Sequence, residues 1–424
     1  ELLNGGTSTD TLTGPNDVVT WTINGAGISN LSDGSNLLTT GFSAFEVLQG
    51  GNNNDTFNVS ALGSIASIDA GNSIDGDIVD LTSLATDVTV SLDLLAVADL
   101  IIADVEQLDA NPTKTNKLIA GNFSNTWTIS GLNSGDLNGM KFNDFNDITG
   151  NDGVDEFSFD PLGSISGTID ASGNDDIVDY SKLTTVNISL TDAFSGVINA
   201  ESIRGNNTDS TLTANNVINA WTITDENDGA VGGINFIDFN NLTGGSDDDT
   251  FTFANGSSIT GIIDGAGEGL LGDKVDMSSV GGAIEVVVGA TPLSVSGMNI
   301  IRIEDITGNN SNSTLVGGNL DNTWTIAGNN DGSLGTLTFT NFNNLTGGDL
   351  NDTFTFSNDT SAITGLISGG NQTTQDVISY ASQAIAVNVT LGQDVTGVEE
   401  IIGGSTTSTL TAQSVNAGNT INNW

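Results

Sequence analysis

Aspartate is the residue of this sequence whose type and spacing could do chemistry. One aspartate precedes each of four similar phenylalanine segments, at Asp55, Asp155, Asp249 and Asp352. A second phrase pairs aspartates three residues apart, at Asp77/Asp80, Asp176/Asp179 and Asp273/Asp276, and its fourth copy keeps only Asp376. Carboxylates on a tightly curled chain supply oxygens of the kind that calcium prefers. Aspartates also hydrogen-bond the backbone of the turns they build. Calcium binding and turn formation are therefore both open interpretations.

The charge of the chain is strongly acidic. Its 424 residues include 53 acidic and 7 basic side chains, a formal net charge of −46, and neither histidine nor cysteine. Without clusters of lysine or arginine to neutralise phosphate, we expect no nucleic-acid partner. The apolar run Leu94–Ile102 is short and interrupted by Asp99, so we expect no membrane insertion. Disulfides and thiolate metal sites are excluded, whereas divalent cations would relieve the self-repulsion.

The elements that carry these aspartates recur about every hundred residues. Tryptophans stand at 21, 127, 221, 324 and 424, each in a similar local phrase. A phenylalanine follows Trp127, Trp221 and Trp324 at one constant offset, at Phe142, Phe236 and Phe339, and it follows Trp21 at a longer offset, at Phe42. We therefore expect repeats over residues 5–110, 111–204, 205–307 and 308–403, with 404–424 starting a further repeat.

The segments inside each repeat have the pattern of short strands. Phrases such as VNISL from Val186 and VNVTL from Val387 alternate apolar with polar residues, and Gly, Asn or Asp bounds them. The pattern predicts an all-β fold, a parallel β-helix (β-solenoid) with about 20 residues per coil, continuous over residues 1–424. Aromatic side chains would fill its interior, asparagines would form ladders at its turns, and its length would be on the order of 100 Å. An array of immunoglobulin-like sandwiches is the rival architecture.

Several phrases resemble the haemolysin-type calcium-binding nonapeptide of RTX proteins, G-G-x-G-x-D-x-U-x, in a degenerate form. They include GGTSTDTLT from Gly5 and GGSDDDTFTF from Gly244. The middle glycine is mostly replaced, and uninterrupted runs of the nonapeptide are absent. The longer NTWTI, FNNLTGG and DTFTF phrases are similar to the β-strand repeats of giant secreted bacterial adhesins and filamentous-haemagglutinin-like proteins. The resemblance implies secretion to the outside or surface of a bacterial cell. It also implies calcium as a ligand at the aspartate position of the motif, which is held by Asp10, Asp55, Asp155, Asp209, Asp249 and Asp352.

The repeated pattern favours a structural function over catalysis. Acidic pairs recur from repeat to repeat, as structure does, and the two arginines, Arg204 and Arg302, fall at non-equivalent positions, so we expect no enzyme. We expect an extracellular fibre, adhesin stalk or biofilm-matrix filament stabilised by calcium. Pairs of threonines flank an inward Trp or Phe, as at Thr20/Thr22 and Thr353/Thr355. An ice- or carbohydrate-binding solenoid is therefore the alternative, and a polysaccharide-active β-helix enzyme is a weaker one.

The two ends of the sequence also lead to expectations. The chain begins at Glu1, not methionine, which is typical of a processed product or of a piece of a longer chain. The segment from Ser408 repeats the phase of the opening segment, and neither end shows a capping strand. We therefore expect its partners to be further copies or repeats joined end to end, together with cell-surface or matrix polysaccharide.

Overall fold

The computed structural model describes residues 2–25, 29–33, 36–72, 76–191, 196–267, 269–288, 293–295, 297–371 and 375–412. Trp424 and the rest of 413–424 lie outside these residues, so most of the predicted further repeat is not described. The chain is almost entirely β, with 45% strand and 1% helix, which confirms the predicted all-β class. No helix in the described ranges is both long and apolar enough to span a membrane.

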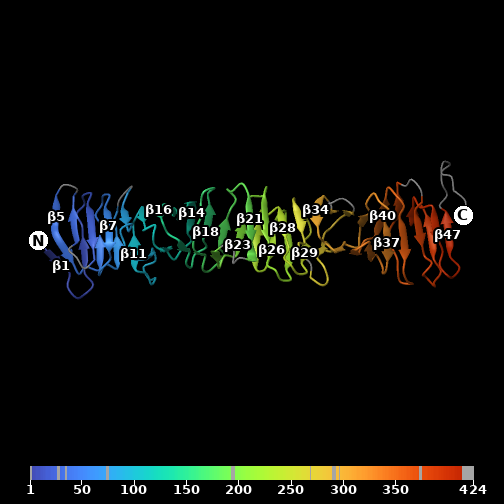
Figure 1. Cartoon of the computed structure of the whole chain (residues 1–424), viewed down its shortest axis with the longest axis horizontal. Helices are drawn as coiled ribbons and strands as arrows, with labels where there is room; N and C mark the ends of the chain where they lie inside the picture. The colour runs from blue at the N-terminus through green and yellow to red at the C-terminus, as the bar shows by residue number, and fades with distance from the viewer. Residues whose placement is uncertain are drawn as a thin grey trace. The chain divides into compact units, whose positions relative to one another are not determined.

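The chain divides into two compact units. Unit 1 comprises Glu1–Val186 and Asp192–Asn206, and unit 2 comprises Asn187–Thr191 and Asn207–Trp424. Each unit contains an aromatic sheet, whose strands carry the tryptophans, and an aliphatic sheet, whose inward residues are Leu, Ile and Val. Figure 1 shows the strands of each unit stacked as successive rungs. Strand β21 (Val186–Ser189) contains the boundary between the units.

In unit 1 the hydrogen-bonded order of each sheet follows from its strand pairs. The aromatic sheet runs β1 (Leu2–Asn4), β5 (Leu37–Ser43), β4 (Ser29–Ser32), β3 (Thr20–Asn24), β7 (Thr56–Ala61), β9 (Ile78–Asp80), β12 (Gln107–Asp109), β16 (Met140–Asn143), β15 (Ser134–Leu137), β14 (Thr126–Gly131), β18 (Glu156–Phe159), β20 (Ile177–Asp179) and β23 (Ser202–Arg204). The aliphatic sheet runs β2 (Thr11–Thr13), β6 (Val47–Gln49), β8 (Ser67–Asp69), β11 (Leu100–Ala103), β10 (Thr89–Ser91), β13 (Lys117–Ile119), β17 (Asp147–Thr149), β19 (Ile169–Asp170) and β22 (Val197–Ile198).

Unit 2 has the same two-sheet plan. Its aromatic sheet runs β27 (Ile234–Ile237), β26 (Asp228–Val231), β25 (Ala220–Asp225), β29 (Thr250–Phe253), β31 (Lys274–Asp276), β35 (Asp305–Thr307), β39 (Leu337–Thr340), β38 (Gly332–Leu334), β37 (Thr323–Ile326), β41 (Thr353–Phe356), β43 (Val377–Ser379) and β46 (Glu400–Ile402). Its aliphatic sheet runs β24 (Ser210–Thr213), β28 (Asn241–Thr243), β30 (Ile262–Asp264), β34 (Met298–Ile301), β33 (Leu293–Val295), β32 (Ile284–Val287), β36 (Ser313–Val316), β40 (Asn344–Gly348), β42 (Ile367–Gly370), β45 (Val395–Thr396), β44 (Asn388–Leu391) and β47 (Thr409–Ala412).

Parallel pairing between successive coils confirms the parallel β-helix. Phe57 pairs with Val79, and Phe157 pairs with Val178. The chain therefore returns to the same sheet after nearly the predicted number of residues per coil. Trp127 and its partner Phe157 are separated by more than one such length, because an extra segment intervenes. An immunoglobulin-like sandwich has antiparallel sheets, so this pairing decides against the rival architecture. The expectation that residues 1–424 form one continuous solenoid depends on how the two units are joined, and it stays a prediction.

The extra segment is an antiparallel excursion that the sequence pattern did not predict. After each described tryptophan strand, the aromatic sheet adds two antiparallel pairs before the coil resumes: β3–β4–β5, β14–β15–β16, β25–β26–β27 and β37–β38–β39. The hairpin between β15 and β16 turns at Asn138 and Gly139, both at positive φ (53° and 95°), as a two-residue type I′ turn requires. The excursion is the structural reason for the constant offset between Trp and Phe.

Stacked aromatic rings fill the interior at the four tryptophans that the structure describes, as the sequence predicts. Trp21, Trp127, Trp221 and Trp324 are fully buried. They stack on Phe57, Phe157, Phe251 and Phe354 of the next coil, with ring centroids 5.2, 5.6, 5.3 and 5.3 Å apart. The phenylalanine at the end of each excursion meets the same tryptophan edge-on, as Phe142 meets Trp127 at 5.5 Å. Such contacts add to the apolar burial that stabilises the coils.

Candidate functional site

The predicted aspartates lie in rows of stacked acidic side chains at one corner of the coils, where the chain enters the aromatic sheet. In the first row the Val19 N–H donates to Asp55 Oδ1 at 3.0 Å. The Asp55 N–H donates to Asp77 Oδ1 at 2.6 Å, and the Asp77 N–H donates to Glu106 Oε2 at 2.8 Å. Each carboxylate thus accepts the backbone N–H of the matching residue one coil earlier. We call such a row a carboxylate ladder.

The same ladder recurs in each of the other three repeats. With the N–H of each residue donating to the carboxylate of the next, the rows are Asn125–Asp155–Asp176–Glu201 (2.6, 2.7 and 2.9 Å), Asn219–Asp249–Asp273–Glu304 (2.8, 2.7 and 2.8 Å) and Asn322–Asp352–Asp376–Glu399 (3.0, 2.8 and 2.9 Å). Two ladders belong to unit 1 and two to unit 2. The two aspartates of each ladder are fully buried.

A glycine five positions earlier makes room for the first aspartate of each ladder. A β-carbon at Gly150 would lie 2.2 Å from Asp155 Oδ2, and one at Gly347 would lie 2.1 Å from Asp352 Oδ2. In the first ladder the glycine after this position, Gly51, donates its N–H to Asp55 Oδ2 at 2.7 Å. The chain therefore curls around its own carboxylate, which is the turn chemistry expected of aspartate after glycine.

Asparagines complete the corners, as the sequence predicts. In three ladders the first residue also points its amide at the aspartate: Asn125 and Asn219 Nδ2 donate to Asp155 and Asp249 Oδ1 at 2.8 Å, and Asn322 Nδ2 donates to Asp352 Oδ1 at 2.7 Å. At the entry to the aliphatic sheet, asparagine oxygens take the place of carboxylates in the repeats over 111–204 and 205–307. There Asn146 and Asn240 Oδ1 accept the N–H groups of Asn116 and Ser210 at 3.0 and 2.8 Å.

Burial raises the pKa of several ladder aspartates, and repulsion from neighbouring carboxylates adds to the effect. Loss of water raises the pKa of Asp273 to about 7, and the charges of Asp249, Glu304 and Asp248 add to this effect. Burial likewise raises the pKa of Asp176 and of Asp352 to about 6, and hydrogen bonds from the backbone only partly oppose it. Among the described residues, the second carboxyl oxygen (Oδ2) of these three aspartates accepts no hydrogen bond.

The six residues proposed as calcium ligands do not converge on one site. Asp55, Asp155, Asp249 and Asp352 hold equivalent positions in four separate ladders. Asp10 lies half-buried where the chain enters the aliphatic sheet, with its N–H donating to Glu46 Oε2 at 2.9 Å, and Asp209 is exposed. Within the described ranges, no three acidic side chains gather in a way that could hold a metal ion.

The ladder geometry fits a capping role better than a calcium shell. The Oδ1 atom of the first aspartate in each ladder already accepts a backbone N–H. The partial positive charge of that hydrogen would repel a cation bound to the same oxygen. This arrangement supports turn formation, one of the two interpretations left open by the sequence. Calcium binding stays a prediction, with its test given below.

Sequence reasoning missed the four glutamates that end the ladders. Glu106, Glu201, Glu304 and Glu399 each stand two positions before an apolar residue of a short strand, as in Glu106-Gln107-Leu108. The same spacing holds for Asp55 with Phe57 and for Asp77 with Val79. An acidic residue two positions before an inward apolar residue is therefore the signal that would have found the acidic members of each ladder.

The second aspartate of each D-x-x-D phrase has a different environment from the first. Asp80, Asp179 and Asp276 end their strands and accept, with Oδ1, the N–H two positions later at 2.9, 2.7 and 2.9 Å. Asp179 also pairs with Arg204 at 3.4 Å. These residues close turns at the strand ends.

The threonine pairs point away from the interior, as the sequence predicts. In the repeat over 308–403, five hydroxyl side chains stand in register across adjacent strands: Thr338, Ser333, Thr325, Thr355 and Ser379. We call this set the hydroxyl row. The equivalent row of the repeat over 111–204 in unit 1 is mostly charged: Lys141, Asp136, Thr128, Ser158 and Asp179. A surface of hydroxyls without charges is thus specific to one repeat of these two.

No protein-family model matches this chain, and no curated protein matches it in sequence.

Proposed function

We propose that this chain is a structural repeat protein of a bacterial extracellular fibre, adhesin stalk or matrix filament. One observation carries the proposal: within each unit, two repeats join by the same parallel pairing that holds coils together inside a repeat. In unit 1 the last aromatic strand of the first repeat, β12, pairs with β16 of the second. In unit 2, β35 pairs with β39 in the same way. Repeats that join through such a surface add to one another without closing.

The composition supports a place outside the cell. Buried aromatic stacks and ladders recur in every repeat, while the surface carries most of a formal net charge of −46. Such a surface stays soluble and repels other acidic polymers, and divalent cations bind to it and bring neighbouring chains together. Further copies joined end to end, calcium and matrix polysaccharide are the partners of this proposal.

Electron microscopy of the purified chain tests the proposal. We expect uniform threads whose lengths increase with protein concentration and with millimolar calcium, because a strand edge whose backbone groups lack a partner pairs with a strand of another copy. A parallel sample in chelator provides the control for cation dependence. Short particles of a single length at every protein concentration, with and without calcium, would contradict filament formation.

The hydroxyl row favours a second candidate, binding of ordered water or ice. Its members repeat at the strand spacing of about 4.8 Å and expose hydroxyls with no charge between them. Regularly spaced hydroxyls match a regular lattice of hydrogen-bonding partners better than a charged row does, because charges order the water around themselves.

Unit 1 supplies the substitutions for this test. The variant T338K/S333D/S379D gives the hydroxyl row the side chains that unit 1 carries at the same positions, so the fold should tolerate it. We expect the intact chain to show thermal hysteresis and the variant to lose most of it at an unchanged melting temperature. Absence of thermal hysteresis in the intact chain would dismiss this candidate.

A further inference from the structure

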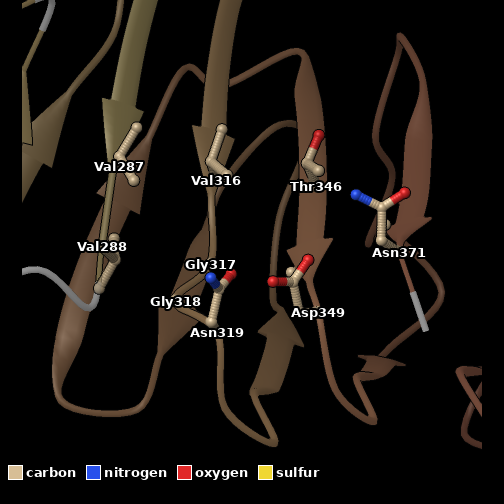
Figure 2. A pocket seen from close by; sticks show the side chains of 11 residues that line it. Val287, Val288, Val316, Gly317, Gly318, Asn319, Thr346, Asp349 and Asn371 are labelled. Carbon is tan, nitrogen blue, oxygen red and sulfur yellow. The ribbon is translucent and has the colours of Figure 1, made fainter. Parts of the chain in front are cut away.

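A hollow of about 360 Å³ opens on the outer side of the aliphatic sheet of unit 2. It lies at the ends of β32, β36 and β40 and beside Asn371, the residue that follows β42 (Figure 2). Val287, Val316 and Thr346 stand in register on its upper part. Because their neighbours Val286, Leu315 and Leu345 are fully buried, these three side chains point outward.

Three copies of one short phrase form the lower part of the hollow. Gly-Gly-Asn at 317–319, Gly-Gly-Asp at 347–349 and Gly-Gly-Asn at 369–371 lie at the C-terminal ends of the three successive strands β36, β40 and β42. The glycines pack backbone on backbone. A β-carbon at Gly317 would lie 2.3 Å from the Gly347 carbonyl oxygen, and one at Gly370 would lie 2.1 Å from the Gly348 oxygen. The floor of the hollow is therefore bare backbone, and side chains rise only at its rim.

The rim presents hydrogen-bonding groups that the fold does not use. Asn319, Asp349 and Asn371 are exposed, and in the described part of the chain their side chains make no hydrogen bond. Figure 2 shows Asn319 and Asp349 at the ends of neighbouring strands, below Val316 and Thr346. The two amides donate and accept, the carboxylate accepts, and the Thr346 hydroxyl does both. Successive coils thus repeat a similar set of polar groups at about 4.8 Å.

The chemistry of the lining selects among ligand classes. The lining contains no lysine, arginine or histidine, so phosphates and acidic sugars find no cation, and Asp349 repels them. One carboxylate among neutral groups is too few for a calcium shell. Hydroxyl groups match amide, carboxylate and threonine side chains, and the C–H face of a sugar packs on valine and glycine. A neutral, hydroxyl-rich polymer fits all of these features.

We propose that this hollow binds a linear, neutral polysaccharide that crosses three coils. Hydroxyls of successive sugars hydrogen-bond Asn319, Asp349 and Asn371, and one sugar face lies against Val287 and Val316. The inference goes beyond the structural function, since it assigns a ligand class to one place in unit 2 and holds whether or not the chain forms filaments.

Affinity electrophoresis of the intact chain tests the proposal. Gels contain laminarin, xylan, galactomannan or dextran as neutral probes and polygalacturonate as an acidic one. We expect at least one neutral polysaccharide to retard the chain and polygalacturonate to leave its mobility unchanged. Failure of all four neutral probes to retard the chain, or retardation by polygalacturonate alone, overturns the proposal.

Matched variants place the binding at the hollow. We expect N319A/D349A/N371A to weaken the affinity for the retarding polysaccharide at least tenfold without changing the melting temperature. The control N52A/N72A/N122A removes three exposed asparagines that follow glycine in unit 1, and it should bind as the intact chain does. D349N keeps the shape and the hydrogen-bonding capacity of the rim and should bind within about threefold of the intact chain. Equal losses in the triple variant and its control overturn the proposal.

Discussion

Each aspartate of a carboxylate ladder holds a backbone N–H at a buried corner of the coil. A buried N–H without a partner costs free energy comparable to a lost hydrogen bond, so an acceptor is needed wherever the chain turns into the aromatic sheet. An aspartate oxygen reaches the N–H of the previous coil, as Asp155 Oδ1 reaches the Asn125 N–H at 2.6 Å. The carboxylate thus supplies the acceptor that the buried N–H needs. It also places two acidic groups one coil apart, where their negative charges repel each other.

The stability of the fold should therefore depend on pH. The pKa of Asp273 is about 7 in the folded chain and about 3.9 in an unfolded chain. Between these values the folded state keeps the proton and the unfolded state has lost it. Stability is thus highest on the acid side and falls as pH rises through the folded pKa. We expect the melting temperature to fall as the pH rises from about 5 to about 7 and to level off above that, with Asp176 and Asp352 contributing to the fall up to about pH 6.

The variant D273N isolates this effect at one residue. Asparagine keeps an oxygen for the Asp249 N–H but does not titrate, so the melting temperature should fall less steeply between pH 5 and pH 8. D276N, at the last residue of β31, the strand that begins directly after Asp273, is the matched control and should keep the slope of the intact chain. The hypothesis fails if the melting temperature of D273N falls as steeply with pH as that of the intact chain.

A second residue-scale prediction concerns the glycines beneath the ladders. A β-carbon at Gly347 would lie 2.1 Å from Asp352 Oδ2 and 2.2 Å from the Gly369 oxygen, whereas at Gly173 it would meet nothing within 4 Å. We expect G347A to destabilise by about 1–3 kcal/mol and G173A to change stability by less than about 0.5 kcal/mol. Thermal or denaturant unfolding of both variants checks the difference. Equal effects would show that the glycine–carboxylate contact is not tight.

At the scale of elements, the antiparallel excursions explain how tryptophan and phenylalanine meet. The excursion places Phe142 edge-on to Trp127, and the resumed coil stacks Phe157 on the other side. Excursion length is set by tight hairpin turns, and these turns differ between repeats. Unit 1 uses Asn138-Gly139, while unit 2 uses Gly232-Gly233 at the corresponding hairpin, with φ of 59° and 88°.

A substitution in the Gly232-Gly233 turn of unit 2 should stabilise the fold. Gly232 has the left-handed backbone that asparagine tolerates, and a β-carbon there meets nothing within 4 Å. Asparagine reduces the freedom of the unfolded chain, so we expect G232N to stabilise by about 0.4–1 kcal/mol. The same measurement on G232V should show destabilisation, because a β-branched residue is strained at positive φ. Destabilisation by G232N would mean that the turn is not of type I′.

At the scale of the whole molecule, charge is the dominant property. A formal net charge of −46 opposes compaction, and divalent cations reduce that repulsion. We expect millimolar calcium to raise the melting temperature. Magnesium should act about equally if screening dominates, while a larger effect of calcium would indicate specific sites, including Asp10 and Asp209 at the turns. Identical melting curves in chelator and in millimolar calcium would contradict both explanations, charge screening and specific calcium sites.

Much of the fold could be predicted because it depends on periodic local signals. The spacing of Trp21, Trp127, Trp221 and Trp324 predicted the repeat, and apolar alternation predicted the strands and their inward residues. The antiparallel excursions were not predicted, because a strand that reverses has the same alternation as one that continues. The ladders were predicted only in part. Asp155 and Asp176 stood out in the repeats, but their contact depends on which coils pair.

The sequence by itself determined the class of structure. Strand alternation, glycine-bounded turns and a hundred-residue period are together typical of a repeating β architecture, which buries the alternating apolar residues. The sequence also determined the acidity of the surface, which is a sum over residues and needs no fold. Only the tertiary structure decided what the aspartates do. Whether a carboxylate faces a backbone N–H or a cation depends on the register between coils that are distant in sequence, such as those of Trp127 and Phe157, and local sequence does not encode that register. The hollow near Asn319 arises for the same reason, because three copies of a glycine phrase create it only when their coils lie side by side.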